Sequence, residues 1–438
     1  MEKVESAGAK VQVPVSLVKT VSLVATPIIS HEEMSNYHTS KHKRSRIFFA
    51  LYYWGKLMGI NIFTLTTSND VEYSYCSVFY VLNLIVCHTY LFYHSWKERL
   101  NFLMPGETPV SVIVDFGGIS SMYLEAVTAW LTNCCFKNRL SSIIKAFVQA
   151  ESTSQKLNLP ENYEKYFKKL IIYLVFSNTI FVSITVFVHV TLTYFSNYES
   201  GQWILFNLPR AVSIYYMTLF IWALFIVKQK FRRLNKQLCT LMQSHCIESS
   251  ENVYQRPLIR EPTNNSRRDS TALSDKISLI SQSHRELRDL INRIVDHLAL
   301  LIVFQITTQL TFLTFDVYAI YRYVKTHELT RLVDFLFVIA FGVGISIPVT
   351  LLTIGSNVCG STLYEANNTG NILHSVYNNS DNYFDTREAA RLNTLSLDLL
   401  ENKARMSILG FFDLDHFFMY QVIATSTTYL VIMLQFYS

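Results

Sequence analysis

Long apolar windows with few charges alternate with polar segments along most of the chain. Two examples are 170–195 (LIIYLVFSNTIFVSITVFVHVTLTYF) and 332–357 (LVDFLFVIAFGVGISIPVTLLTIGSN). Each is long enough to cross a hydrocarbon layer of about 30 Å as a helix. The pattern predicts an all-α membrane protein with seven transmembrane helices, at about 74–95, 109–134, 170–195, 205–227, 298–321, 332–356 and 408–436.

The polar segments between these windows predict further elements. Residues 1–46 read as a disordered tail, and 47–65 as an interfacial or re-entrant helix because Lys56 and two glycines interrupt its apolar run. The long segment 228–297 has amphipathic ends and a polar middle, about 249–274, that we expect to be disordered. Residues 357–407 form a second amphipathic, helical segment before the last transmembrane helix.

Charge then predicts the orientation. Of the 38 Lys and Arg residues, 32 fall on the side of the N-terminus. The other six are Lys97, Arg99, Arg210, Arg322, Lys325 and Arg331. Because basic loops stay in the cytoplasm, we expect a cytoplasmic N-terminus and an external C-terminus, without a cleaved signal peptide. The net charge of +5 is spread over these loops, which argues against a nucleic-acid partner.

This orientation has consequences for modification. It places all seven cysteines in helices or on the reducing cytoplasmic side, so we expect no disulfide. The Asn-x-Ser/Thr triplets at 264–266, 367–369 and 378–380 would stay unglycosylated for the same reason.

No enzyme signature is present: the chain has no Gly-rich phosphate loop, no His-x-x-x-His pair and no Gly-x-Ser-x-Gly turn. We therefore expect no catalysis, cofactor or metal site. His88 and His94 are too far apart along the first helix to form a metal pair by themselves.

The C-terminus carries the most specific motif. Thr428-Tyr429, five hydrophobic residues and Gln435-Phe436 resemble the pattern that closes insect gustatory receptors, and the upstream segment 410–415 (GFFDLD) resembles the start of that family's last helix. Length, number of helices, orientation and the long cytoplasmic loop agree with the family over nearly the whole chain. The resemblance implies a receptor in the plasma membrane of chemosensory neurons that acts as a homotetrameric ligand-gated cation channel, alone or in hetero-oligomers.

In such a channel the seventh helices surround the pore. Thr428, Val431, Ile432 and Gln435 share one helical face, so four copies could present apolar and polar rings in series, with Phe436 beside them. The alternative is that Gln435 only bonds a neighbouring helix.

Candidate ligand contacts are polar or aromatic residues at the outer ends of the helices, where ionisable groups are costly and mark a cavity or a partner. They are Asp115, Tyr123, His189, Arg210, Tyr215, Gln309 and Asp316. The alternative is that Arg210 pairs with Asp115 or Asp316 only to neutralise a buried charge.

Two ligand classes fit such a pocket. A sugar such as fructose is slightly favoured, because the stretch 231–235 (FRRLN) resembles the fructose-receptor branch; bitter plant compounds are the alternative. Two other protein classes also have many helices. A secondary transporter would show inverted repeats, which we do not find, and a G-protein-coupled receptor would have the opposite orientation.

Overall fold

The computed structural model describes residues 55–159 with gaps, isolated positions between 168 and 190, and the ranges 200–254, 264–326, 332–379 and 386–435. Eight helices are described in these ranges, together with four short strands. The helices are α3 (Tyr75–Asn101), α4 (Pro109–Cys135), α5 (Lys137–Lys156), α7 (Ser200–Tyr254), α8 (Asn264–Thr326), α9 (Leu332–Asn379), α10 (Thr386–Glu401) and α11 (Phe418–Gln435).

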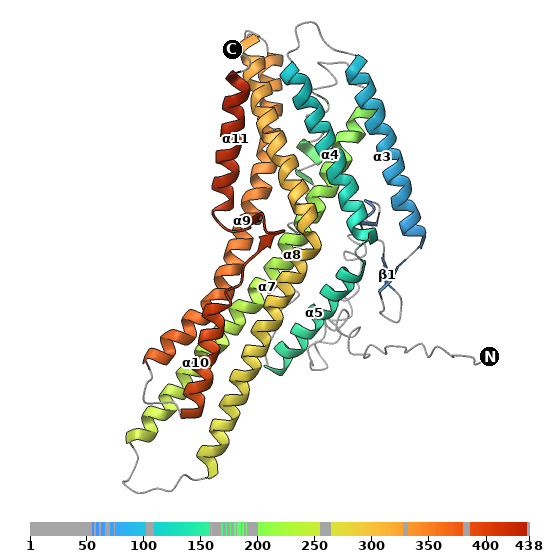
Figure 1. Cartoon of the computed structure of the whole chain (residues 1–438). Coiled ribbons are helices and arrows are strands. Elements are labelled where there is room, and N and C mark those ends of the chain that lie inside the picture. Colours follow the sequence, from blue (N-terminus) through green and yellow to red (C-terminus); the bar gives the residue numbers. More distant parts are fainter. Residues whose placement is uncertain are drawn as a thin grey trace, which may run out of the picture.

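Three helices run the length of the molecule (Figure 1). α7, α8 and α9 have 55, 63 and 48 residues, which corresponds to roughly 70–95 Å at 1.5 Å per residue. A helix of that length extends well beyond a hydrocarbon layer of about 30 Å. Each therefore has a transmembrane half and a second half outside the membrane, which we call the cytoplasmic half on the basis of the predicted orientation.

The shorter helices divide between these halves. α3, α4 and α11 lie beside the transmembrane half, while α5 and α10 lie beside the cytoplasmic half (Figure 1). Among the described residues, three stretches are long and apolar enough to cross a membrane: Tyr75–Lys97, Ala211–Ser244 and Asp275–Lys325. The apolar part of α11, Phe418–Ile432, is shorter.

Two small antiparallel hairpins complete the fold. β1 (Phe63–Leu65) pairs with β2 (Val71–Tyr73), with Thr64 opposite Glu72. β3 (Ser407–Ile408) pairs with β4 (Phe412–Asp413) directly before α11. The turn of the second hairpin has positive φ at both central residues, Leu409 (50°) and Gly410 (76°), which is the geometry of type I′ turns.

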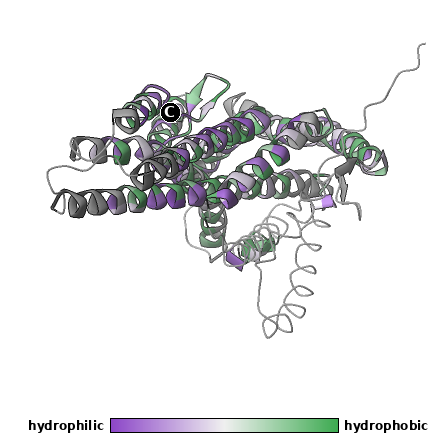
Figure 2. Cartoon of the chain, turned by 90° about the horizontal axis from the view of Figure 1, so that it is seen from below, coloured by the Kyte–Doolittle hydropathy of each residue, from purple (hydrophilic) through white to green (hydrophobic). Residues whose placement is uncertain are grey.

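The main hydrophobic core continues through the cytoplasmic half. Its largest fully buried side chains include Phe231, Leu234 and Leu238 of α7 and Leu287 and Leu290 of α8. These positions recur at three- and four-residue spacing, so each long helix buries one stripe and exposes the rest to water. Seen from below, the long helices accordingly carry both hydrophilic and hydrophobic residues along their length (Figure 2).

The structure differs from the sequence interpretation in two places. The last helix begins at Phe418 rather than near 408, because the β3–β4 hairpin occupies 407–413. The polar segment 249–274 contains the helical end of α7, to Tyr254, and the helical start of α8, from Asn264. Each transmembrane segment at 205–227, 298–321 and 332–356 is continuous with a helix beyond the membrane.

Several expectations fall largely outside the described residues. These concern the tail 1–46, the third transmembrane helix at 170–195 and most of 47–65. The described part of 47–65 includes a turn at Met58–Gly59 that lies against Leu84 of α3 and Trp130 of α4.

Candidate functional site

The start of α11 is fixed by contacts of its own N-terminal turn. Asp415 Oδ1 accepts hydrogen bonds from the backbone N–H groups of Phe417 (2.9 Å) and Phe418 (3.1 Å). A carboxylate in this position satisfies the first N–H groups of a helix and complements the positive end of its dipole. The sequence FDLD–HFF therefore encodes both the hairpin and the cap that defines where the helix begins.

α9 holds the same junction from the side. Ser356 Oγ donates a hydrogen bond to the carbonyl oxygen of Asp415 at 2.6 Å. His416 lies so close to Gly360 that a Cβ added there would be 2.5 Å from the imidazole ring. Movement of α9 at this level must therefore move the base of α11 or break these contacts.

The hairpin is also anchored in the cytoplasmic core. Met406 and Ile408 are fully buried, and Asn367 of α9 bonds both the N–H and the carbonyl of Ala404, at 2.8 and 3.2 Å. Arg288 of α8 donates to the carbonyl of Asn402 at 2.9 Å. The chain leading into α11 is thus bonded to both α8 and α9.

α11 itself has one covered face and one uncovered face. Phe418, Val422 and Ser426 recur every four residues and are buried against the rest of the chain. The motif residues Thr428, Val431, Ile432 and Gln435 are exposed; Phe436 lies outside the described residues. Thr428 Oγ1 donates to the carbonyl of Ala424 within the helix (2.9 Å). The face that the sequence assigned to a pore is therefore open in the single chain.

The candidate ligand residues are distributed over two seams between helices. Tyr215 on α7 and Gln309 and Asp316 on α8 are buried. On the same two helices, Gln305 Nε2 donates to the carbonyl of Ser213 at 3.4 Å. Gln309 Oε1 is buried without a hydrogen-bond partner among the described residues. An unsatisfied amide oxygen at this depth is costly unless water or a ligand reaches it.

Tyr123 belongs to the other seam, between α3 and α4. Its ring stacks on Phe92 (centroids 4.3 Å apart) and on His88 (5.8 Å), and its hydroxyl is 3.0 Å from Thr89 Oγ1. Trp130 meets His88 edge-on at 5.6 Å. Tyr123 therefore packs in the interface between α3 and α4.

The side chains of the other three candidates lie outside the described part of the structure. Asp115 and Arg210 lie in α4 and α7, but their side chains fall outside the described part of the structure, as does His189 altogether. The proposed pairing of Arg210 with an aspartate is therefore not tested.

Sequence reasoning missed the aromatic seam. His88, Phe92 and Trp96 recur every four residues on α3 and meet Phe116, Tyr123 and Trp130, which recur every seven on α4. These spacings mark one face of a helix, so pairing two aromatic stripes could have identified the seam.

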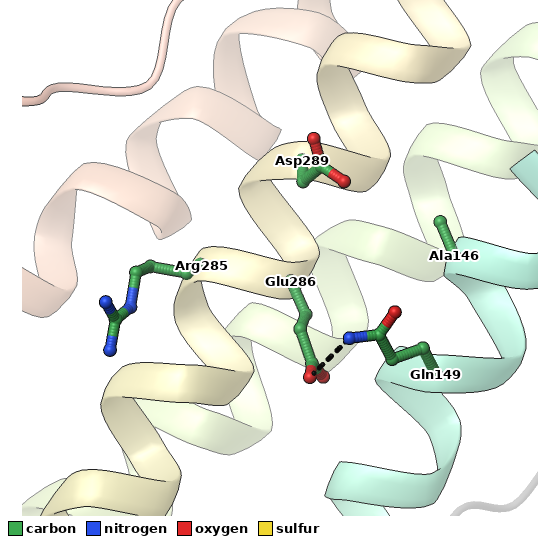
Figure 3. Close-up of a pocket in the computed structure, with 5 residues that line it drawn as sticks. All are labelled: Ala146, Gln149, Arg285, Glu286 and Asp289. Carbon is green, nitrogen blue, oxygen red and sulfur yellow. Dashed lines mark hydrogen bonds between the residues drawn. The ribbon is translucent and has the colours of Figure 1, made fainter. Parts of the chain in front are cut away.

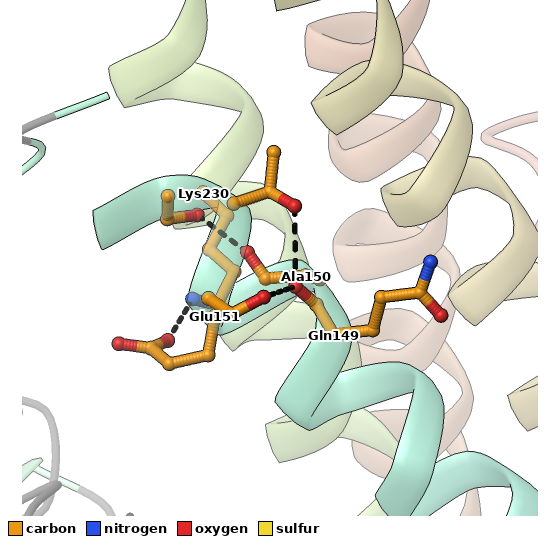
Figure 4. A network of polar contacts seen from close by, with 7 residues as sticks. Gln149, Ala150, Glu151 and Lys230 are labelled. Atoms are coloured by element: carbon orange, nitrogen blue, oxygen red, sulfur yellow. Dashed lines mark hydrogen bonds and ion pairs between the residues drawn. The ribbon is translucent and has the colours of Figure 1, made fainter. Parts of the chain in front are cut away.

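Polar contacts on the cytoplasmic side join α5 to the long helices. Lys230 of α7 and Glu151 of α5 form a buried ion pair with Nζ–Oε2 at 2.5 Å (Figure 4). A shallow groove of about 200 Å³ lies between α5 and α8, lined by Ala146, Gln149, Arg285, Glu286 and Asp289 (Figure 3). Glu286 Oε1 accepts a hydrogen bond from Gln149 Nε2 at 3.0 Å across it.

Comparison with known proteins identifies this arrangement. No curated protein sequence matches the chain. Among solved structures, the fold is similar to the insect olfactory receptor OR5 from Machilis hrabei, with a TM-score of 0.59, 10% sequence identity, and coverage of 90% of this chain and 98% of that one. The same receptor in complex with eugenol gives a TM-score of 0.57 at the same identity and coverage.

These similarities confirm the helical fold expected from the sequence. The sequence model of the 7tm chemosensory receptor family matches residues 48–438, nearly the whole chain. That family consists of membrane receptors rather than enzymes, and the resemblance drawn from the C-terminal motif is confirmed at this level. The chain is a member of the 7tm chemosensory receptor family.

Proposed function

We propose that this receptor is a gustatory receptor subunit and that four copies form a tastant-gated, non-selective cation channel in the plasma membrane of chemosensory neurons. The observation that carries the proposal is the uncovered face of α11, on which Thr428, Val431, Ile432 and Gln435 all lie exposed. Among its described side chains the last helix buries Phe418, Val422 and Ser426, which leaves a second face available for copies of itself. Apolar rings on that face gate by dewetting, and a ring of amides admits hydrated cations.

The contacts at the base of α11 support a route from ligand to pore. A ligand that binds the open state more tightly shifts the population toward it. Displacement of α8 and α9 reaches α11 through Arg288, Asn367 and Ser356, each bonded to the segment 402–415. The buried Gln309 and Asp316 lie on α8 itself, so ligand contact there acts on a helix whose cytoplasmic half is bonded to this segment through Arg288.

A sugar such as fructose is our first choice of ligand, with bitter plant compounds as the alternative. Hydrogen-bonding groups beside aromatic rings suit both classes. The stretch 231–235 does not help to choose by direct contact, because Phe231, Leu234 and Asn235 are buried in the cytoplasmic half. The structural relative was solved with eugenol, so a phenolic compound belongs in the same test panel.

The test is whole-cell recording from cells that express this chain alone. We expect fructose to evoke a non-selective cation current that persists when GDP-β-S in the pipette blocks G proteins. A response only to alkaloids or eugenol would move the ligand to the second class. Saturable uptake without current would reject the channel in favour of a transporter, and a current abolished by GDP-β-S would favour a G-protein-coupled receptor.

The pore assignment has its own test. Gln435→Ala should change single-channel conductance or open probability severalfold while the half-maximal tastant concentration shifts little, because the amide lies on the proposed pore face of α11 whereas the buried candidate ligand contacts Tyr215, Gln309 and Asp316 belong to α7 and α8. Gln243→Ala is the matched control, since Gln243 is an exposed glutamine in the cytoplasmic half of α7. Identical currents in wild type and Gln435→Ala would remove Gln435 from the pore.

A further inference from the structure

The described cysteines are all free, and three of them are exposed: Cys76, Cys87 and Cys135. Cys76 is the second residue of α3 and Cys135 is the last residue of α4. α3 and α4 are antiparallel neighbours joined by the aromatic seam, so these two thiols lie at the same end of the helix pair. In the predicted orientation that end faces the cytoplasm.

The depth of Cys135 is set by the residues that follow it. Lys137 and Arg139 come immediately after the end of α4. Arg139 Nη1 donates to the carbonyl of Asp296 at 3.0 Å, directly before the transmembrane part of α8 at 298–321. Basic residues at this level match the anionic headgroups of the cytoplasmic leaflet. Cys135 is therefore placed at the boundary between hydrocarbon and cytosol.

Both thiols stand at the end of a stripe of exposed apolar side chains on their own helix. On α4, Leu124 is 45% exposed and Leu131 42% exposed; with Cys135 they follow spacings of seven and four, which is one helical face. On α3, Cys76 shares a face with Phe79 (69% exposed) and Val86 (67%). In a membrane such stripes face lipid. A long hydrocarbon chain attached at either thiol could lie back along the stripe beside it.

We propose that Cys76 and Cys135 are S-acylation sites that carry long-chain fatty acyl groups in the cytoplasmic leaflet. Exposed juxtamembrane thiols are the substrates of this modification. The cysteine sulfur attacks the carbonyl carbon of a fatty acyl-CoA thioester, the bond from that carbon to the CoA sulfur breaks, and CoA leaves as a thiol with the cysteine proton. One thioester replaces another, so no oxidant or reductant is needed.

The acyl groups would fix the lower ends of α3 and α4 in the leaflet, beside the Met58–Gly59 turn that packs between them. The inference rests on the predicted orientation, and it is independent of which tastant opens the receptor. Cys87 serves as an internal comparison. It is also exposed on α3 but lies about 16 Å further along the helix from Cys76, beyond the reach of a cytosolic acyl transfer.

The experiment is metabolic labelling of the full chain in insect cells with an alkynyl palmitate analogue, followed by purification, azide-dye coupling and treatment with hydroxylamine. We expect hydroxylamine-sensitive label on the wild-type receptor, a partial loss in Cys76→Ser and in Cys135→Ser, and loss of at least nine-tenths in the double variant. Cys87→Ser, Cys134→Ser and Cys239→Ser should keep the wild-type signal.

The signal is normalised to receptor that elutes as an intact species on size-exclusion chromatography, so that a folding defect is not read as loss of label. Absence of label from the wild type, or label retained by the double variant, would overturn the proposal. Tastant currents are recorded from the same cells. A labelled receptor without current would reject the proposed channel and leave acylation standing, whereas current without label would do the reverse.

Discussion

The transmembrane and cytoplasmic halves of this receptor are held together in different ways. In the transmembrane helix α3, 17% of the most apolar window is buried inside the protein, whereas Phe231, Leu234 and Leu238 in the cytoplasmic half of α7 are fully buried. Phe79, Tyr90 and Tyr93 of α3 are each about two-thirds exposed. Lipid is as apolar as these side chains, so the bilayer removes the hydrophobic force that would otherwise drive α3 against its neighbours.

The cytoplasmic half is surrounded by water, so the hydrophobic effect again drives its helices together. Hydrogen bonds from polar side chains also join the helices there. Asn235 of α7 accepts a hydrogen bond from Thr369 Oγ1 at 2.6 Å and donates to the carbonyl of Glu365 at 2.8 Å. His284 Nε2 lies 3.0 Å from the carbonyl oxygen of Ala366. We infer that the cytoplasmic half stabilises the fold of the subunit, whereas the less tightly packed outer helices can move when a ligand binds.

The largest effect should come from the cytoplasmic core. Phe231→Ala empties a fully buried site and should lower the free energy of unfolding by about 3–5 kcal/mol. The matched change in α3, Phe79→Ala, removes a ring that is 69% exposed and should cost less than about 1 kcal/mol. Thermal melting of the purified receptor in nanodiscs measures both. Equal losses would mean that the two halves are equally packed.

The next effect concerns the ion pair between α5 and α7. Lys230→Met leaves the 95%-buried Glu151 side chain without its cation and should destabilise the protein by about 3 kcal/mol. Adding Glu151→Leu removes the stranded charge, so the double variant should regain most of that loss. If the double variant were the less stable of the two, the pair would contribute through more than mutual neutralisation.

A smaller effect is expected at the turn that closes the lower end of the α3–α4 seam. Gly59 has a φ of 73°, and an added Cβ would lie 2.9 Å from Leu84 Cδ1 and 3.1 Å from Trp130 Nε1. Gly59→Ala should therefore cost about 1–3 kcal/mol. Gly118→Ala is the control, because an added Cβ there meets open space. A neutral Gly59→Ala would show that this turn is not packed as described.

The smallest effect depends on pH. Burial raises the pKa of the Cys359 thiol from 9.0 to about 12. Between these values the unfolded chain has lost a proton that the folded chain retains, so stability falls as pH rises above about 9, by about 1.4 kcal/mol per pH unit. Between pH 8 and 10 we expect the melting temperature of the wild type to fall more steeply with pH than that of Cys359→Ala. An equal pH dependence in the two proteins would show that folding does not change the pKa of the thiol.

Much of this architecture follows from sequence because membranes impose simple rules. Apolar length located the helices, and three- and four-residue spacing placed Thr428, Val431 and Gln435 on one face of α11. The hairpin before that helix was missed, since two-residue strands such as Ser407–Ile408 leave almost no periodic signal. The sequence also could not show that Tyr123 and Gln309 lie in different interfaces between helices. Depth along a helix can be predicted from sequence, whereas the identity of the neighbouring helix cannot.

The unbroken course of α8 has a mechanical consequence. Its 63 residues form a lever of roughly 95 Å, without a joint between the outer seam and the cytoplasmic core. A tilt of about 2° about the outer end displaces Arg288, roughly 57 Å away along the helix, by about 2 Å. A very small movement at the outer end would therefore be amplified into a displacement of about 2 Å, delivered through Arg288 to the segment that carries the last helix.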